Sequence, residues 1–175
     1  MKRNVFYILF LLLTTYAHGQ SDEEYWEKWN TRYPEVDIIS ILEFEKHYAD
    51  SVENNPQIPS WYSRKDAFRF KAEYLGKTRN TSIEVITSMK TVFKLFIGDP
   101  KQLDGMIEKE VLFKVGQENI WMPIQPQILK ALKKEVKKGI SVTLYCLFLN
   151  EHTINNVLYN TLFISEFSKQ PPLVK

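Results

Sequence analysis

The chain has 175 residues, with 23 Lys and Arg against 21 Asp and Glu, which gives a formal net charge of +2. Lys2 and Arg3 account for this excess, so the chain after them is close to neutral. Nucleic-acid binding requires a marked basic excess, and we therefore expect no nucleic-acid partner. The single cysteine, Cys146, excludes an internal disulfide, so the fold must depend on a hydrophobic core.

The N-terminal segment has the pattern of a secretory signal peptide. A positive start, Lys2-Arg3, precedes an apolar run from Val5 to Leu13, and Ala17-His18-Gly19 places small residues before Gln20. The apolar run is shorter than the roughly 17–25 residues that span a bilayer. We therefore expect residues 1–19 to be cleaved off near Gly19 and Gln20. The mature protein is then predicted to be periplasmic or secreted in a bacterium and not membrane-spanning.

Residues 20–80 are predicted to form a helical region. Ser21 and the acidic residues after it are typical of a helix N-terminus. Apolar residues keep a helical period from Ile38 to Glu53 and predict a second helix. Ser63 with Asp66 resembles a capping box, and Gly76 is typical of a helix end, so a third helix is expected over 63–75. Aromatic side chains recur on one face of the first predicted helix: Tyr25, Trp26, Trp29 and Tyr33.

The segment from Thr81 to Gly98 supports two interpretations. Thr81 with Glu84 resembles a capping box, and the apolar spacing from Ile83 onward fits a helix. The same segment is rich in β-branched residues, and Met89–Ile97 would make a buried strand. We predict a short helical turn followed by a strand from about Met89.

The rest of the chain predicts a hairpin, a helix and two further strands. Apolar residues alternate over 108–115, a polar turn follows at 116–119, and residues 120–124 form the second strand of the hairpin. Pro126 and Gly139 bound an amphipathic helix. Apolar runs predict strands at 142–149 and 158–167, and we expect residues 170–175 to be a disordered tail.

With Met89–Ile97 as the first strand, the predicted element order is β-β-β-α-β-β. The OB-fold has this order, with its helix between the third and fourth strands. We therefore predict an α+β protein in which the helical residues 20–80 precede a small five-stranded, OB-like β-barrel at 81–169. The resemblance is one of element order, and no family motif accompanies it.

Trp121 is the strongest candidate for a ligand-binding residue. In the predicted strand, Ile120, Met122 and Ile124 share one face, and Trp121 and Gln125 share the other. OB-like barrels bind ligands on such a face by stacking on aromatic side chains. We predict that Trp121 and Gln125 line a cleft between the barrel and the N-terminal helices. The competing interpretation is that the Trp26 and Trp29 stripe covers Trp121 as part of the core.

Other chemistry-bearing residues give weaker signals. Glu43 and His47 share a helix face, but a metal site needs three or four ligands, so we predict no metal and no cofactor. Cys146 lies in the most apolar segment, where a thiol is typically inert, although His152 is six residues away. We therefore assign no catalytic residue.

These observations favour an exported, non-enzymatic binding or protein-interaction module, whose partner is an unknown protein or a small envelope ligand. One alternative is a hydrolase-type envelope enzyme that uses a carboxylate pair, drawn from Glu43, Glu45, Glu108 and Glu110. The other is a structural subunit of an envelope assembly.

Overall fold

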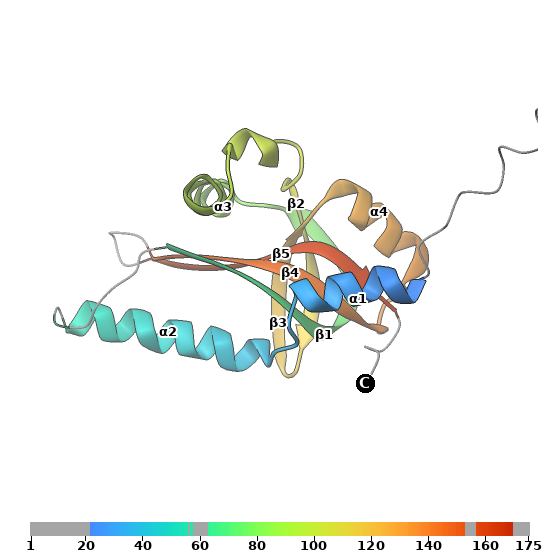
Figure 1. Ribbon diagram of the computed structural model, residues 1–175, viewed down its shortest axis with the longest axis horizontal. Coiled ribbons are helices and arrows are strands. Elements are labelled where there is room, and N and C mark those ends of the chain that lie inside the picture. The colour runs from blue at the N-terminus through green and yellow to red at the C-terminus, as the bar shows by residue number, and fades with distance from the viewer. Residues whose placement is uncertain (1–21, 56, 58–62, 153–156, 170–175) are drawn as a thin grey trace, which may run out of the picture.

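The computed structural model describes residues 22–55, 57, 63–152 and 157–169 of the chain, and Figure 1 shows their arrangement. The predicted signal peptide, the C-terminal tail and most of the polar turn after β4 lie outside these residues. The protein is α+β, with a five-stranded mixed sheet. Its helices are α1 (Asp22–Arg32), α2 (Ile38–Asn54), α3 (Ile83–Phe96) and α4 (Pro126–Glu135), with the 3₁₀ helix η1 (Pro100–Leu103). Its strands are β1 (Ser63–Asn80), β2 (Lys109–Val115), β3 (Glu118–Ile124), β4 (Ser141–His152) and β5 (Leu158–Ser168).

The strand pairings close the sheet on itself. The order is β1-β2-β3-β5-β4, and β4 pairs in turn with β1. Four of these pairs are antiparallel, while β3 and β5 form a parallel pair at Ile124 and Ile164. The predicted hairpin is confirmed as β2 and β3, and the two C-terminal strands are confirmed as β4 and β5.

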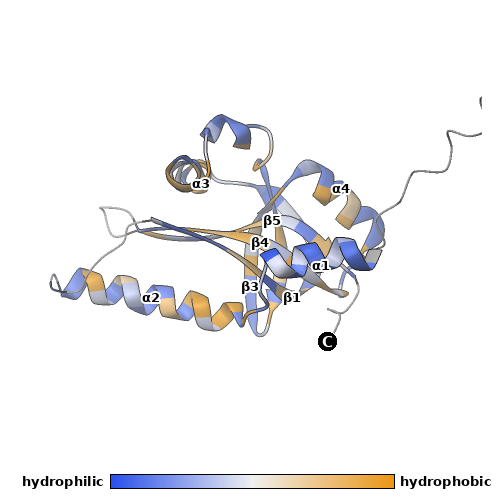
Figure 2. Ribbon diagram, viewed as in Figure 1, coloured by the Kyte–Doolittle hydropathy of each residue, from blue (hydrophilic) through white to orange (hydrophobic). Residues whose placement is uncertain are grey.

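The main core lies on the inner face of this sheet. Alternate residues of each strand point inward, as the twofold period of a strand requires. Helix α4, which the sequence predicted between Pro126 and Gly139, contributes Leu132 to this core, its C-cap residue Val136 also belongs to it, and the first turn of α2 contributes Ile38. Figure 2 shows that the apolar residues of α2 gather mainly in its N-terminal half, beside the sheet. Both predicted N-terminal helices are confirmed as α1 and α2.

The predicted third helix at 63–75 is wrong, because this segment is the strand β1. Phe68, Phe70, Ala72 and Tyr74 alternate with polar residues, and this twofold period outweighs the capping pattern at Ser63. The strand pairs with β4 over residues 63–73 and with β2 over residues 73–80, so both halves of the strand have a partner. The sheet thus begins at residue 63 and not at Met89.

The predicted strand at Met89–Ile97 is also wrong, because these residues are the C-terminal part of α3 and its C-cap residue, Ile97. The Ser82 hydroxyl accepts a hydrogen bond from the backbone N–H of Val85 and caps the helix. One helical face is then buried, with Met89, Val92 and Phe93 packed in a second small core that includes Phe163 of β5. The order β-β-β-α-β-β is therefore incorrect at its first element, since α3 and η1 lie between β1 and β2.

Helices α2 and α3 pack against different cores, α2 against the main core and α3 against the second small core. In Figure 1, α2 lies along one side of the sheet and α3 along the other. Glu35, in the link between α1 and α2, forms an isolated parallel bridge with Arg69 of β1.

Among the described residues, no helix is long and apolar enough to cross a membrane.

Candidate ligand-binding site

Trp121 lies on the outer face of β3, as its strand phase predicted. Met122 and Ile124 belong to the inner core, and Ile120 packs against that core. Trp121 is opposite Leu112 of β2 in the register of the hairpin, so both side chains point away from the core. The indole is neither buried nor fully exposed. Its surroundings therefore decide whether it is a structural residue or a binding residue.

Arg79 covers part of the indole. The guanidinium carbon of Arg79 lies 4.4 Å from the centroid of the Trp121 ring, which is a close cation–π contact. The Arg79 Nε also donates to the Glu110 Oε2 at 2.5 Å. Half of the Arg79 side chain is exposed, whereas the Glu110 side chain is only 3% exposed. Because a buried carboxylate needs a partner, Glu110 fixes the position of the guanidinium on the indole.

A backbone irregularity places Arg79 on this face. The register between β1 and β2 shifts between Tyr74 and Thr78, so that Arg79 is opposite Glu110. Gly76 lies inside the shift with a positive φ of 71°, a conformation that favours glycine. The sequence does not predict this position of Arg79, because Gly76 is equally typical of a helix end.

These residues line an open cavity of about 320 Å³. It extends from Trp121 to residues 158–161 at the start of β5 and to Val85 of α3. Strands β3 and β5 are paired at Ile124 and Ile164, and the cavity is lined by residues that precede this pair in both strands. The site is therefore built from four strands and α3.

Asn160, a polar residue of the cavity lining, is held by a hydrogen bond with a buried residue. The Asn150 side-chain N–H donates to the Asn160 Oδ1 at 2.6 Å, and Asn150 itself is buried. Asn160 thus has one acceptor site of its carbonyl oxygen occupied within the protein, and its amide nitrogen carries two N–H donors. Tyr159 and Thr161 add hydroxyl groups to the lining.

The structure does not bring Gln125 into this cavity. Gln125 occupies the N-cap position of α4 without a side-chain capping bond, and its Oε1 accepts a hydrogen bond from the Gln127 side chain. Gln125 is not among the residues that line the cavity. Its predicted ligand-binding role stays a prediction without support from this arrangement.

The predicted cleft between the sheet and the N-terminal helices is not where Trp121 lies. The cavity beside Trp121 is lined by α3 and not by α1 or α2. The aromatic stripe of α1 packs on Tyr145 of β4: the ring centroids of Trp26 and Trp29 each lie 5.5 Å from that of Tyr145. The competing interpretation, in which Trp26 and Trp29 cover Trp121, is therefore also wrong.

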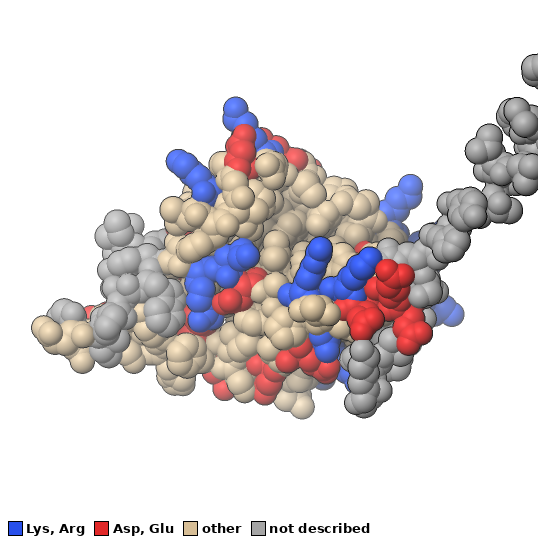
Figure 3. Space-filling view, viewed as in Figure 1, with Lys and Arg blue, Asp and Glu red and all other residues tan. Residues whose placement is uncertain are grey.

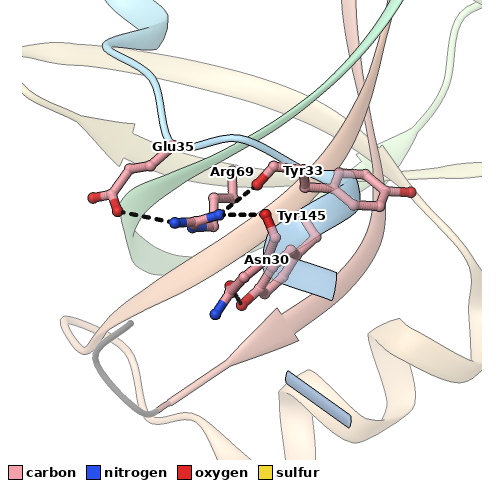
Figure 4. Close-up of polar contacts among 5 residues, drawn as sticks. All are labelled: Asn30, Tyr33, Glu35, Arg69 and Tyr145. Atoms are coloured by element: carbon pink, nitrogen blue, oxygen red, sulfur yellow. Dashed lines mark hydrogen bonds and ion pairs between the residues drawn. The ribbon is translucent and has the colours of Figure 1, made fainter. Parts of the chain in front are cut away.

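Polar contacts fix α1 on the sheet around Tyr145, as Figure 4 shows. The Tyr145 hydroxyl donates to the Asn30 Oδ1 at 2.8 Å. The Arg69 guanidinium donates to the backbone carbonyls of Asn30 and Tyr33 at 2.8 and 2.7 Å, and it also pairs with Glu35. Burial raises the pKa of Tyr145, an effect that the nearby Arg69 opposes, so the hydroxyl remains a hydrogen-bond donor.

A cleft between α1 and the sheet does exist elsewhere. A cavity of about 250 Å³ is lined by Tyr25 and Trp26 of α1, by Glu135 of α4 and by the end of β5. Its two carboxylates already have partners, because Tyr25 donates to Glu166 at 2.9 Å and Lys169 pairs with Glu135 at 3.2 Å. The polar groups of this cavity are therefore satisfied within the protein.

The metal and nucleophile candidates do not assemble into sites. Among the described residues, no group of three His, Cys, Asp or Glu side chains could hold a metal ion. Cys146 is fully buried in the core, and burial raises the pKa of its thiol. Six residues of strand, about 20 Å, separate it from His152. The His152 Nε2 instead lies 2.9 Å from the Glu53 Oε1 at the end of α2.

The acidic residues considered for acid–base chemistry are also dispersed. Glu45 is buried against Arg64, while Glu110 is buried against Arg79. Glu43 and Glu108 are exposed on α2 and before β2. Each buried carboxylate thus has its own arginine. Figure 3 shows acidic and basic side chains interspersed over the face in view.

Comparison of the chain with protein-family models, with curated proteins and with solved structures gives no match. The case for a function therefore depends on the geometry of the site.

Proposed function

We propose that this protein is an exported binding module that holds a small ligand in the cavity beside Trp121. The observation that carries the proposal is a half-buried tryptophan on the outer face of the sheet, in an open cavity of about 320 Å³. Ligand sites combine an apolar surface with a few fixed polar groups. Trp121 supplies the surface, while Arg79 and Asn160 supply polar groups that are themselves held by buried partners.

The same proposal includes an OB-like barrel. Its support is the closed order β1-β2-β3-β5-β4, the parallel pairing of β3 with β5, and the position of α4 between β3 and β4. In such barrels the outer face of the second and third strands is a common ligand surface. Trp121 of β3 and Glu110 of β2 lie on that face.

Recognition suits this cavity better than catalysis does. Glu110 is the acidic residue of the lining, and it forms an ion pair with Arg79. A general acid or base has to exchange a proton with the substrate, which a carboxylate at 3% exposure and bound to a guanidinium does poorly. The export part of the proposal rests on the signal-peptide pattern of residues 1–19.

A fragment screen followed by NMR tests this function. The ¹⁵N-labelled mature protein, from Gln20 onward, is mixed with a library of small aromatic and sugar fragments. We expect fragments that bind to shift the indole N–H resonance of Trp121 and the backbone resonances of residues 158–161. The same fragments should bind at least about tenfold more weakly to Trp121→Ala, because stacking on an aromatic side chain is worth about 1–3 kcal/mol.

The matched control is Phe44→Ala, which truncates an aromatic side chain that is 55% exposed on α2, away from the cavity. This variant should bind the fragments as the wild type does. Fragments that leave Trp121 unperturbed and collect at the cavity of Tyr25 and Trp26 would refute the proposal.

A further inference from the structure

We propose that the ligand of the Trp121 cavity bears a carboxylate beside a flat surface, and that Arg79 binds that carboxylate. This inference rests on the proposed function, which it deepens by naming the ligand class.

The Arg79 guanidinium lies on the Trp121 ring and uses only part of its hydrogen-bonding capacity. Its guanidinium stacks on the Trp121 ring at 4.4 Å, and its Nε is taken by Glu110 at 2.5 Å. Within the part of the chain that the structure describes, Glu110 is the polar partner of this guanidinium, so the two terminal amino groups keep their hydrogens for a ligand. Those hydrogens form a planar fork that matches the two oxygens of a carboxylate.

Two other side chains of the lining also offer hydrogen-bond donors. Asn160 has its carbonyl oxygen bonded to Asn150, so its amide offers N–H donors. The indole nitrogen of Trp121 can only donate. Arg79, Asn160 and Trp121 thus all offer donors to the oxygen acceptors of a ligand, whereas the Tyr159 and Thr161 hydroxyls can donate or accept.

Glu110 does not cancel this preference. Its carboxylate is 3% exposed and lies on the Nε side of the guanidinium. It therefore acts as a positioning residue: it keeps Arg79 on the indole, while the terminal amino groups remain accessible on a side chain that is half exposed. A guanidinium has five N–H donors, so it can bind Glu110 and a second carboxylate together.

Three probes that share a phenyl ring test the inference: benzoate, benzamide and benzylamine, which are negative, neutral and positive at pH 7. Each is titrated into the ¹⁵N-labelled mature protein while the indole resonance of Trp121 is followed. We expect benzoate to bind about tenfold more tightly than benzamide, since hydrogen bonds to charged groups are the stronger ones. Benzylamine should bind most weakly.

The double variant Arg79→Gln/Glu110→Gln removes the fork without leaving a buried charge unpaired. It should bind benzoate no more tightly than benzamide, and its dispersed spectrum reports that it is folded. Arg79→Lys keeps the charge without the planar fork and should lose part of the preference. Arg32→Gln, an exposed arginine of α1, is the matched control and should leave all three affinities unchanged.

The outcomes separate this inference from the proposed function. Equal affinities for benzoate and benzamide, with Trp121 shifted by both, would overturn the carboxylate assignment and leave the binding cavity in place. Tighter binding of benzylamine would overturn the assignment as well. No shift of Trp121 with any probe would contradict the inference and the proposed function together.

Discussion

Tyr145 and Trp121 both lie on the outer face of one closed sheet, yet their surroundings are opposite. Tyr145 is 2% exposed beneath α1, where three aromatic rings and Asn30 contact it. Trp121 instead faces a cavity of about 320 Å³ beside Arg79, to which α3 contributes Val85. The covered residue has the contacts expected of a structural role. The uncovered one keeps a surface on which a ligand can pack.

The largest expected effect of a single substitution is at the covered residue. Tyr145→Ala removes a buried ring that contacts Trp26, Trp29 and Tyr33, so it should lower the free energy of unfolding by about 3–5 kcal/mol. Urea unfolding followed by circular dichroism measures this loss. Phe44→Ala, at an exposed aromatic, should cost no more than about 0.5 kcal/mol. A loss of similar size in both variants would contradict the structural role assigned to the buried Tyr145.

A smaller effect is expected at the ion pair of the uncovered region. Arg79→Met leaves Glu110 buried without its partner, and the free energy of unfolding should fall by about 1–3 kcal/mol at pH 7. Adding Glu110→Gln removes the unpaired charge and should recover most of this loss. Urea unfolding of both single variants and the double variant gives the coupling between them. Strictly additive losses would show that the two side chains do not interact.

The smallest expected effect is a pH dependence of the free energy of unfolding, caused by the buried Glu45 of α2. Burial raises the pKa of Glu45, with Arg64 opposing the rise, so the folded state favours the neutral carboxyl. This contribution to stability is present below the ordinary pKa of about 4.3 and is lost as the pH rises through the raised folded pKa. Relative to Glu45→Gln, the wild type should be most stable near pH 4 and lose that advantage toward pH 7. Urea unfolding across this range tests it, and a constant difference would contradict it.

The sequence predicts those parts of the fold whose local signals agree. Pro126 and the apolar face of α4, the alternation at Val111 to Val115 and the aromatic stripe of α1 each lead to the observed element. The prediction failed at β1, where a capping pattern conflicts with the side-chain period, and at α3, where the β-branched composition conflicts with the capping pattern and the helical spacing. At β1 the alternation of Phe68, Phe70, Ala72 and Tyr74 is satisfied by pairing with β4, a partner about 75 residues away in the chain.

The candidate site was only partly predictable for the same reason. The strand phase of Trp121 follows from its neighbours Ile120 and Met122, and it is correct. Arg79 reaches Trp121 through the register shift at Gly76 and the pairing of β1 with β2, and no local pattern indicates such a contact. The aromatic residues of α1 were recognised as a stripe, but only the folded sheet shows that they pack on Tyr145.

The paired measurement on Trp121→Ala tests the central claim most directly. Urea unfolding gives its stability, and NMR titration with benzoate gives its binding. We predict a loss of stability of only about 1–2 kcal/mol, from partial burial and the contact with Arg79, together with loss of binding at the cavity. A loss as large as that of Tyr145→Ala, with benzoate binding unchanged, would contradict the account, because Trp121 would then be a structural residue.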